Sequence, residues 1–198
     1  MYSLLLDSSN TSLSVGISED SKLIYHTSFS CWQKQSELMI PEIQKALKET
    51  NLSLKDIKEV VCAKGPGSYT GVRIALTIAK ILSQMNNAKL VLISSLRIMG
   101  TKEQEYIALM NARSSRSYVG VYSKGKILLE DSIMTNEEVK ELICKYPTFD
   151  IIGDTSYLVI NGNKPNEIQG LLSLKDIVEK EKEILKVRPI YLKDNYGI

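Results

Sequence analysis

The sequence has 198 residues, of which 43% are hydrophobic and 24% are charged. This composition is typical of a soluble globular protein that can bury a core, as one domain or as two small ones. The formal net charge is only +2, which excludes a protein that holds nucleic acid by phosphate neutralisation alone. No stretch has the apolar length of a membrane span and the N-terminus lacks the basic segment of a signal peptide, so we expect a cytoplasmic protein.

An apolar run predicts a short buried strand over 2–6, and alternating apolar and polar residues predict a strand over 12–18. A third strand is expected over 22–30. Short polar turns join them, which favours an antiparallel meander. A helix is expected over about 35–49, with Ser36 as its N-cap. The remaining elements of this half are a strand, a helix and a strand, over 57–63, 72–85 and 90–93.

The second half repeats this order loosely, with strands expected over 106–110, 118–122 and 127–132. Thr135-x-x-Glu138 is a capping box that opens a helix through Cys144, and a strand follows over 149–152. Ser173-x-x-Asp176 has the pattern of a further helix cap. It predicts a last helix that contains Leu174, Ile177, Val178, Ile184 and Leu185.

Two successive βββαβα runs predict a duplicated α/β fold of the actin-like, RNase H-like (ASKHA) type, with a cleft between two lobes. We expect the first lobe over 1–98 and the second over 99–198, with the C-terminal segment free to pack back on the first. Actin, the Hsp70 chaperones and many sugar kinases share this architecture, so the fold alone does not define a function. Ligands in such sheets lie beyond the carboxyl ends of strands.

A glycine-rich turn occupies one such strand end. Residues 64–73 read Lys-Gly-Pro-Gly-Ser-Tyr-Thr-Gly-Val-Arg, between an apolar strand and an apolar helix. Three glycines and a proline at this junction indicate a tight turn with a close backbone approach, and the N–H groups of the helix start suit an anion. The spacing matches neither the phosphate loop nor the dinucleotide fingerprint, so the residues alone do not identify what approaches the turn.

An ATP-binding phosphotransferase is one alternative that this pattern leaves open. Asp7 follows the first strand, where an actin-like protein places a carboxylate near metal-bound nucleotide. The residues that would contact an anion or a nucleotide are Asp7, Ser8, Gly67, Ser68, Thr70 and Arg73. An Asp-Ser turn is also among the commonest hairpin connections, and this turn lacks the glycine that admits phosphate closely. We therefore favour a structural turn.

Other catalytic chemistry has weak support. His26 is the one histidine, which excludes a helical His-x-x-x-His pair and a Cys/His zinc cluster of usual spacing. The cysteines Cys31, Cys62 and Cys144 are widely spaced and indicate reduced thiols. The esterase pattern G-x-S-x-G fails because Tyr69 stands at its centre, and Ser68 and Thr70 are expected to cap the helix instead. A magnesium site built only from carboxylates stays open, but we expect no metal and no catalytic residue.

The second helix carries more apolar residues than one sheet face requires. They stand at 72, 74, 75, 76, 78, 79, 81, 82 and 85 and cover nearly the whole circumference. This helix is therefore buried on two sides within the chain, or it meets another subunit.

Several motifs resemble the bacterial TsaB (YeaZ) family. Residues 65–74 are similar to its glycine-rich signature, residues 4–9 to its start, and residues 35–41 to its His-Ser-Glu-x-Leu-x-Pro segment. Asn111-Ala112-Arg113 stands where the family has Asp-Ala-Arg, and residues 189–193 resemble its terminal Pro-x-Tyr-Leu-Arg. The similarity is densest over 1–98. Gln35, Asn111 and Lys193 depart from the family pattern.

This resemblance implies a non-catalytic partner of the paralogous TsaD protein, in the formation of threonylcarbamoyladenosine beside the anticodon of ANN-reading tRNAs. In that family TsaD carries the metal and the transfer site, the ATPase TsaE joins the complex, and TsaB proteins also form homodimers. No cofactor is expected to bind firmly, although ATP or ADP at the interface of the complex stays open. The balanced charge argues that tRNA is contacted only indirectly, and the missing histidines argue against a metallopeptidase.

The resemblance also implies a partner interface on the two helices of the first lobe. The residues expected there are Gln35, Leu38, Met39, Glu42, Gly71, Val72, Ala75, Leu76, Ala79 and Leu82. On this view a charged residue at Ala75 or Ala79 should abolish partner binding without unfolding the chain.

Overall fold

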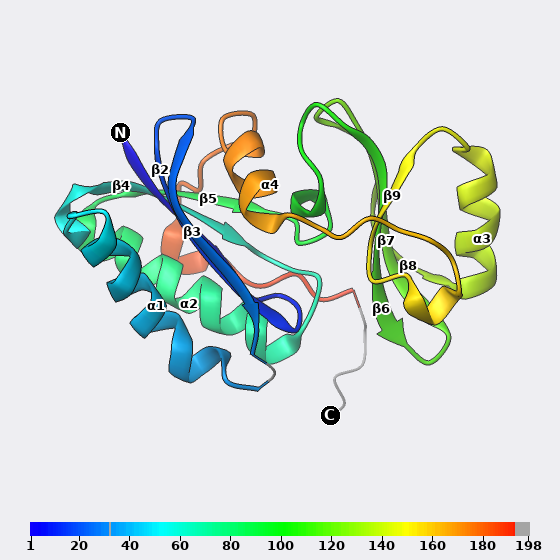
Figure 1. Cartoon of the computed structure of the whole chain (residues 1–198), viewed down its shortest axis with the longest axis horizontal. Coiled ribbons are helices and arrows are strands. Elements are labelled where there is room, and N and C mark those ends of the chain that lie inside the picture. The colour runs from blue at the N-terminus through cyan, green and yellow to red at the C-terminus, as the bar shows by residue number, and fades with distance from the viewer. Residues whose placement is uncertain (32, 193–198) are drawn as a thin grey trace.

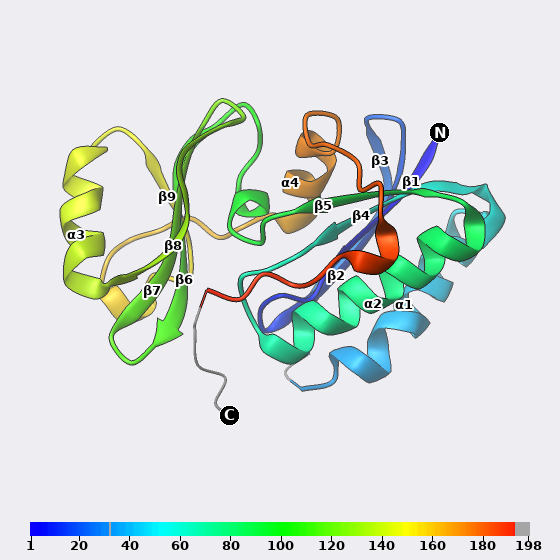
Figure 2. The same ribbon diagram turned by 180° about the vertical axis from the view of Figure 1, so that it is seen from behind.

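A computed structural model describes residues 1–31 and 33–192. It shows two lobes side by side, each built on a mixed β-sheet (Figures 1 and 2). The expected duplicated actin-like architecture is therefore confirmed.

The sheet of the first lobe has the strand order β3-β2-β1-β4-β5. Its strands are β1 (Tyr2–Asp7), β2 (Ser12–Glu19), β3 (Lys22–Ser30), β4 (Ile57–Ala63) and β5 (Lys89–Ile93). β1, β2 and β3 form the expected antiparallel meander, and β4 and β5 join β1 in parallel. Because both faces of this sheet are covered, its central strands are apolar almost without interruption.

Helices cover the two faces of this sheet. α1 (Gln35–Glu49) and α2 (Tyr69–Asn86) lie together on one face (Figure 1). α4 (Glu167–Leu174) lies on the other face, where Ile168, Leu171 and Leu172 form a core with Leu5 and Val61. A helix from the second half of the chain thus completes the first lobe.

The second sheet repeats the first without its fifth strand, in the order β8-β7-β6-β9. Its strands are β6 (Glu105–Arg113), β7 (Arg116–Ser123), β8 (Lys126–Thr135) and β9 (Asp150–Gly153). The helix α3 (Asn136–Lys145) covers one face, and its capping box at Thr135 and Glu138 is confirmed. The other face packs against Leu96 and Met99, which connect the lobes.

The helix expected after Ser173 is wrong. The last α-helix of the described residues, α4, ends at Leu174, and the side chain of Asn166 caps it by accepting a hydrogen bond from Gln169 N (3.3 Å). Ser173 Oγ instead donates to the carbonyl of Gly170 (3.2 Å). The chain then runs along the edge of β5, where Lys180 bridges Val91 and Glu181 N donates to Leu90 O (2.8 Å). Pairing with a free sheet edge replaces the helix.

Two helix starts also differ from expectation. α1 begins at Gln35 after Lys34, without a side-chain cap, so Ser36 is not the N-cap. α2 begins at Tyr69, three residues earlier than expected, because Ser68 caps it. No helix in the described part of the chain is long and apolar enough to cross a membrane.

Candidate functional site

The glycine-rich turn joins β4 to α2, and it packs against the chain's own backbone. A Cβ atom added at Gly67 would lie 2.2 Å from the carbonyl oxygen of Ser9, and one at Gly71 would lie 1.9 Å from that of Ser8. One at Gly65 would lie 2.5 Å from the carbonyl oxygen of Ile190. Only glycine permits these approaches. The close partner that the sequence left unnamed is the turn between β1 and β2, together with the C-terminal segment.

Hydrogen bonds within the chain hold the glycine-rich turn against the turn between β1 and β2. Ser68 N donates to Ser9 O (2.7 Å), and Ser8 Oγ donates to Gly71 O (2.8 Å). Gly71 N donates to Ser68 Oγ (3.2 Å), so Ser68 is the helix cap that its position suggested. Four of the residues proposed for anion contact, namely Asp7, Ser8, Gly67 and Ser68, therefore belong to one interlocked pair of turns.

Asp7 stabilises the turn between β1 and β2 through a hydrogen bond. Its carboxyl is buried, and its Oδ1 accepts a hydrogen bond from Ser9 N (2.9 Å). Burial, followed by the nearby carboxyl of Glu167, raises the pKa of Asp7 to about 7. Burial likewise raises the pKa of Glu167. Among the described residues, no group of three His, Cys, Asp or Glu side chains is placed to hold a metal ion.

The structure shows where the residues expected at the partner interface lie within the chain. Most of them are buried against the first sheet or between the helices: Gln35, Met39, Gly71, Val72, Ala75, Leu76, Ala79 and Leu82. Leu38 and Glu42 are half-buried. A charge at Ala75 or Ala79 would enter the core, because both side chains are fully buried. The proposed test at these two alanines would measure unfolding instead of docking.

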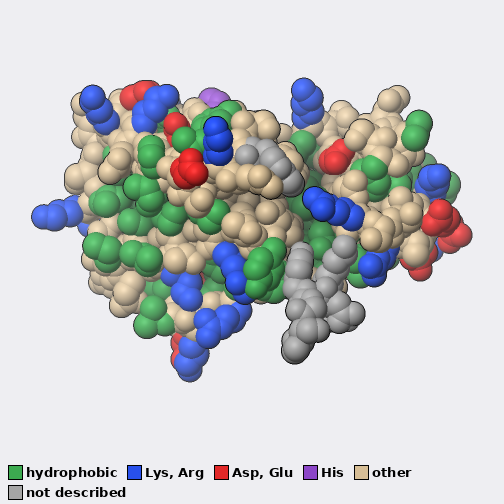
Figure 3. All heavy atoms as spheres, turned by 90° about the horizontal axis from the view of Figure 1, so that it is seen from below, with side chains coloured by type: hydrophobic (Ala, Val, Ile, Leu, Met, Phe, Trp, Pro, Cys, Tyr) green, Lys and Arg blue, Asp and Glu red, His purple; other side chains and the backbone are tan. Residues whose placement is uncertain are grey.

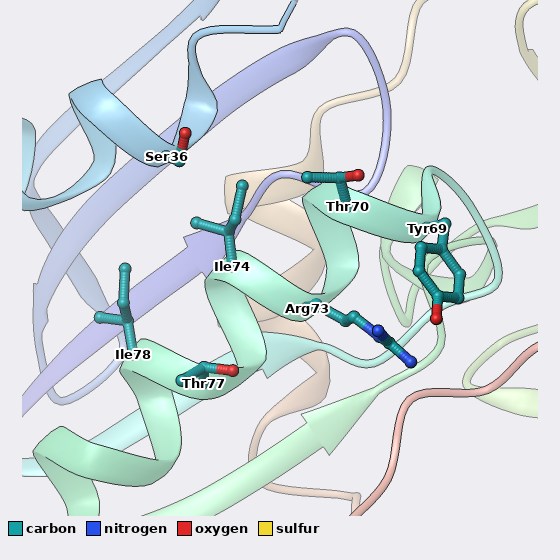
Figure 4. A pocket seen from close by; sticks show the side chains of 7 residues that line it. All are labelled: Ser36, Tyr69, Thr70, Arg73, Ile74, Thr77 and Ile78. Carbon is teal, nitrogen blue, oxygen red and sulfur yellow. The ribbon is translucent and has the colours of Figure 1, made fainter.

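The exposed side of α2 presents a different set of residues. A groove of about 460 Å³ is lined by Ser36 of α1 and by Tyr69, Thr70, Arg73, Ile74, Thr77 and Ile78 of α2 (Figure 4). Thr70 and Arg73, the other two residues proposed for anion contact, lie on this exposed side. We call this surface the α1–α2 groove.

Arg73 is held at one end of the groove. Its guanidinium lies 3.9 Å from the ring centroid of Tyr69, and its Nε donates to the hydroxyl of Tyr191 (2.7 Å). The rings of Tyr69 and Tyr191 stack with centroids 5.0 Å apart. Tyr191 belongs to the C-terminal segment 184–192, which crosses α2 and accepts hydrogen bonds from Lys80 Nζ at Leu185 O and Val187 O. The guanidinium is thereby oriented before any partner arrives.

Apolar side chains continue from the groove along α2. Ile74 and Ile78 are half-buried, and Ile81 and Met85 are 50% and 75% exposed. These four residues are spaced i, i+4, i+7 and i+11, which places them on one face of the helix. Figure 3 shows hydrophobic side chains exposed over this side of the first lobe, between lysine and arginine side chains. Sequence reasoning counted these residues but did not assign them to the outer face.

The departures from the family motifs have local roles. Gln35 is buried, and its Nε2 donates to Asn10 O (3.3 Å) beside the β1–β2 turn. Asn111 Oδ1 accepts a hydrogen bond from Arg113 N (2.8 Å) in the turn between β6 and β7. Lys193 lies outside the described residues.

Comparisons with known proteins agree with this architecture. The family model for TsaD, tRNA N6-adenosine threonylcarbamoyltransferase, matches residues 30–146. The TsaB protein of Buchnera aphidicola subsp. Schizaphis graminum is 32% identical over 71% of this chain and 67% of its own length. The TsaB protein of Bacillus subtilis is 29% identical over 67% of this chain and 60% of its own length.

Structural similarity covers more of the chain than sequence similarity does. The structure of YeaZ from Pseudomonas aeruginosa covers 96% of this chain with a TM-score of 0.78, and this chain covers 99% of it, at 20% sequence identity. At that identity the structural likeness shows only a shared fold. The TsaB relatives that the chain matches are named tRNA threonylcarbamoyladenosine biosynthesis proteins. The sequence matches show the family: the chain belongs to the TsaB (YeaZ) family.

Proposed function

We propose that this chain acts in tRNA threonylcarbamoyladenosine biosynthesis as a non-catalytic subunit that binds a TsaD-type transferase through the exposed side of α1 and α2. The proposal rests above all on the apolar stripe Ile74, Ile78, Ile81 and Met85. Its spacing is that of a helix seam that packs against another helix. A stripe of this kind on the outer side of a helix that already covers a sheet is typical of an interface.

The partner's class follows from the family match. The TsaD family model covers α1, α2 and most of the second sheet of this chain, so a TsaD-type protein has helices equivalent to α1 and α2. Two such helix pairs can form a bundle around the stripe. A second copy of this chain offers the same surface, and homodimers would therefore compete with the heterodimer. TsaE would join the assembled pair.

Co-expression with the TsaD-type protein of the same organism tests the proposal. Ile81→Asp adds a charge to an exposed position in the middle of the stripe, and we expect it to reduce the recovered partner by at least about tenfold. Val159→Asp is the matched control, because Val159 is 92% exposed in the second lobe. Equal recovery of the partner with both variants would contradict the interface.

An ATP-dependent phosphotransferase is the second candidate, and the location of Asp7 beside a glycine-rich turn is the observation that favours it. Calorimetric titration of the isolated chain with Mg-ATP distinguishes the two functions. We expect no micromolar binding, because the N–H groups of Gly65, Ser68 and Gly71 already have acceptors within the chain. Micromolar binding that is lost in Asp7→Ala would support the phosphotransferase instead.

A further inference from the structure

A second cavity lies between the two lobes, on residues that the docking proposal does not use. It has a volume of about 250 Å³, which is room for a small ligand. Lys64, Ser94 and Arg97 line it from the first lobe and the connection between the lobes, and Glu130 and Asp131 line it from β8. We call it the interlobe cavity.

An irregularity in β8 brings the two acidic residues to this cavity. Val119 pairs with Ser132 and Val121 pairs with Leu129, so the single residue Gly120 on β7 lies opposite both Glu130 and Asp131. This is a β-bulge. In a regular strand two adjacent side chains point to opposite faces, whereas a bulge redirects one of them. Both carboxyl groups consequently line the same cavity.

On the acidic side of the cavity, hydrogen bonds from neighbouring side chains hold Asp131 in place and use part of its capacity to accept. Asp131 accepts hydrogen bonds from Ser94 Oγ and from the hydroxyl of Tyr122, one on each carboxylate oxygen. Each oxygen of a carboxylate has a second lone pair, so Asp131 can still accept N–H groups from a ligand. Glu130 is exposed at the rim. Together they suit a ligand ammonium group.

The basic side lacks an acceptor. Arg97 Nη2 donates to Gly125 O (2.6 Å), but its Nε is buried without a hydrogen-bond partner in the described part of the chain. A buried charged donor without an acceptor is unfavourable. Arg97 lines the cavity, and a ligand carboxylate there would form a charge-assisted hydrogen bond with its guanidinium group. Lys64, which is half-buried, adds a second positive charge to this side.

Apolar side chains form the remaining walls. Leu92 and Ile93 come from β5, Ile127 from β8, and Ile190 and Leu192 from the C-terminal segment. The cavity therefore combines two cations, two carboxyl groups and an apolar wall within the volume of one small molecule. A small zwitterion with an aliphatic side chain matches all three features.

We propose that the interlobe cavity binds a free α-amino acid, with the ligand carboxylate at Arg97 and the ligand ammonium group at Glu130 and Asp131. The cavity and the α1–α2 groove have no lining residue in common. The ligand would contact both lobes and the C-terminal segment at once. It would thereby stabilise one arrangement of the lobes.

Calorimetric titration of the full chain tests the proposal with three probes that share the same four-carbon isobutyl unit. L-valine carries both charges, isovalerate only the carboxylate and isobutylamine only the ammonium group. We expect L-valine to bind with a dissociation constant of about 1 mM, and each single-charge analogue to bind at least about tenfold more weakly. Equal binding of isovalerate and L-valine, or no binding of L-valine at about 50 mM, would overturn the assignment.

Variants locate the binding. Arg97→Lys keeps the charge and removes Nε, and we expect it to weaken L-valine binding about tenfold or more. Glu130→Gln changes an exposed side chain that does not contribute to the core, and we expect a loss of about threefold or more. The matched controls are Arg116→Lys and Glu137→Gln, which alter exposed residues outside the cavity. Unchanged binding in Glu130→Gln would refute the position of the ammonium group even if Arg97→Lys were unstable.

Discussion

The turn between β1 and β2 is buried, whereas the equivalent turn between β6 and β7 is exposed. Ser8 and Ser9 are held against the glycine-rich turn at the start of α2. In the second lobe Arg113, Ser114 and Ser115 all have positive φ and face solvent. The difference follows from what comes after the central parallel strand, because β4 leads into α2, whereas β9 leads into a loop with one short 3-10 turn.

The two lobes share a sheet but differ in the turns and helices around it. The sheet and its meander are duplicated, but the glycine-rich turn, the long apolar helix and the α1–α2 groove belong to the first lobe alone. In the first lobe the turns serve to fix the start of α2 and therefore the direction in which its outer stripe points.

Gly71→Val should abolish the packing of the two turns in the first lobe. The added Cβ atom would lie 1.9 Å from the carbonyl oxygen of Ser8. This oxygen belongs to the backbone and the valine side chain is branched at Cβ, so neither group can move aside. We expect a loss of more than about 5 kcal/mol in the free energy of unfolding. Urea denaturation followed by circular dichroism measures it, and a loss below about 1 kcal/mol would show that the turns do not need this contact.

Asp7→Asn should make the first lobe more stable at high pH. The pKa of Asp7 is raised to about 7 in the folded state from about 4 when unfolded, so the folded state binds the proton more tightly and stability falls as pH rises between these values. Asparagine keeps the acceptor for Ser9 N. We expect the variant to gain up to about 4 kcal/mol over the original chain at pH 8, and to gain little at pH 4. A gain that does not change with pH would exclude titration of Asp7 as the cause.

Lys175→Met should show that the segment after α4 belongs to the first lobe. Lys175 Nζ lies 3.0 Å from the carboxylate of Glu59 in β4, and both side chains are buried. Removing the cation leaves a buried charge, and we expect a loss of about 3 kcal/mol. The double variant Lys175→Met with Glu59→Gln should recover part of it. If the double variant is as unstable as the single one, the ion pair is not the source of the loss.

Ser114→Gly should have a small effect of the opposite sign. Ser114 has φ +53° and lies in an exposed turn, unlike the buried turn between β1 and β2 in the first lobe. Glycine adopts this conformation without strain, so we expect a gain of about 0.5 kcal/mol. Thermal denaturation measures it, with Ser123→Gly, in a strand of the same sheet, as a control that should lose stability. A gain in both variants would contradict the assignment to backbone strain.

Local signals predicted most of the fold. The bounds of β3, α1 and β4 match the expected ranges residue for residue, because alternation and helical periodicity are properties of neighbouring positions. The helix wrongly expected after Ser173 shows the limit of this reasoning. The segment from Lys175 has helical spacing, but the unpaired edge of β5 lies beside it in space, and that proximity cannot be read from the segment itself.

The proposed docking surface uses the two helices that the sequence singled out, but other residues of them. The apolar circumference of α2 indicated either two buried sides within the chain or contact with another subunit, and its sequence does not say which side faces the sheet. Ala75 and Ala79 point inward, where their small size lets α2 approach β4 and α1, and the larger Ile81 and Met85 point outward. The role of the glycines also depends on groups far away in the chain, at Ser8, Ser9 and Ile190.

Hydrogen–deuterium exchange tests the docking claim most directly. The isolated chain and its complex with the TsaD-type protein of the same organism would be compared peptide by peptide. We predict that complex formation slows exchange in peptides from residues 36–40 and 69–85, and leaves the exposed turn at 113–116 unchanged. Slower exchange confined to the second lobe, with the peptides of α2 unaffected, would contradict the α1–α2 groove as the docking surface.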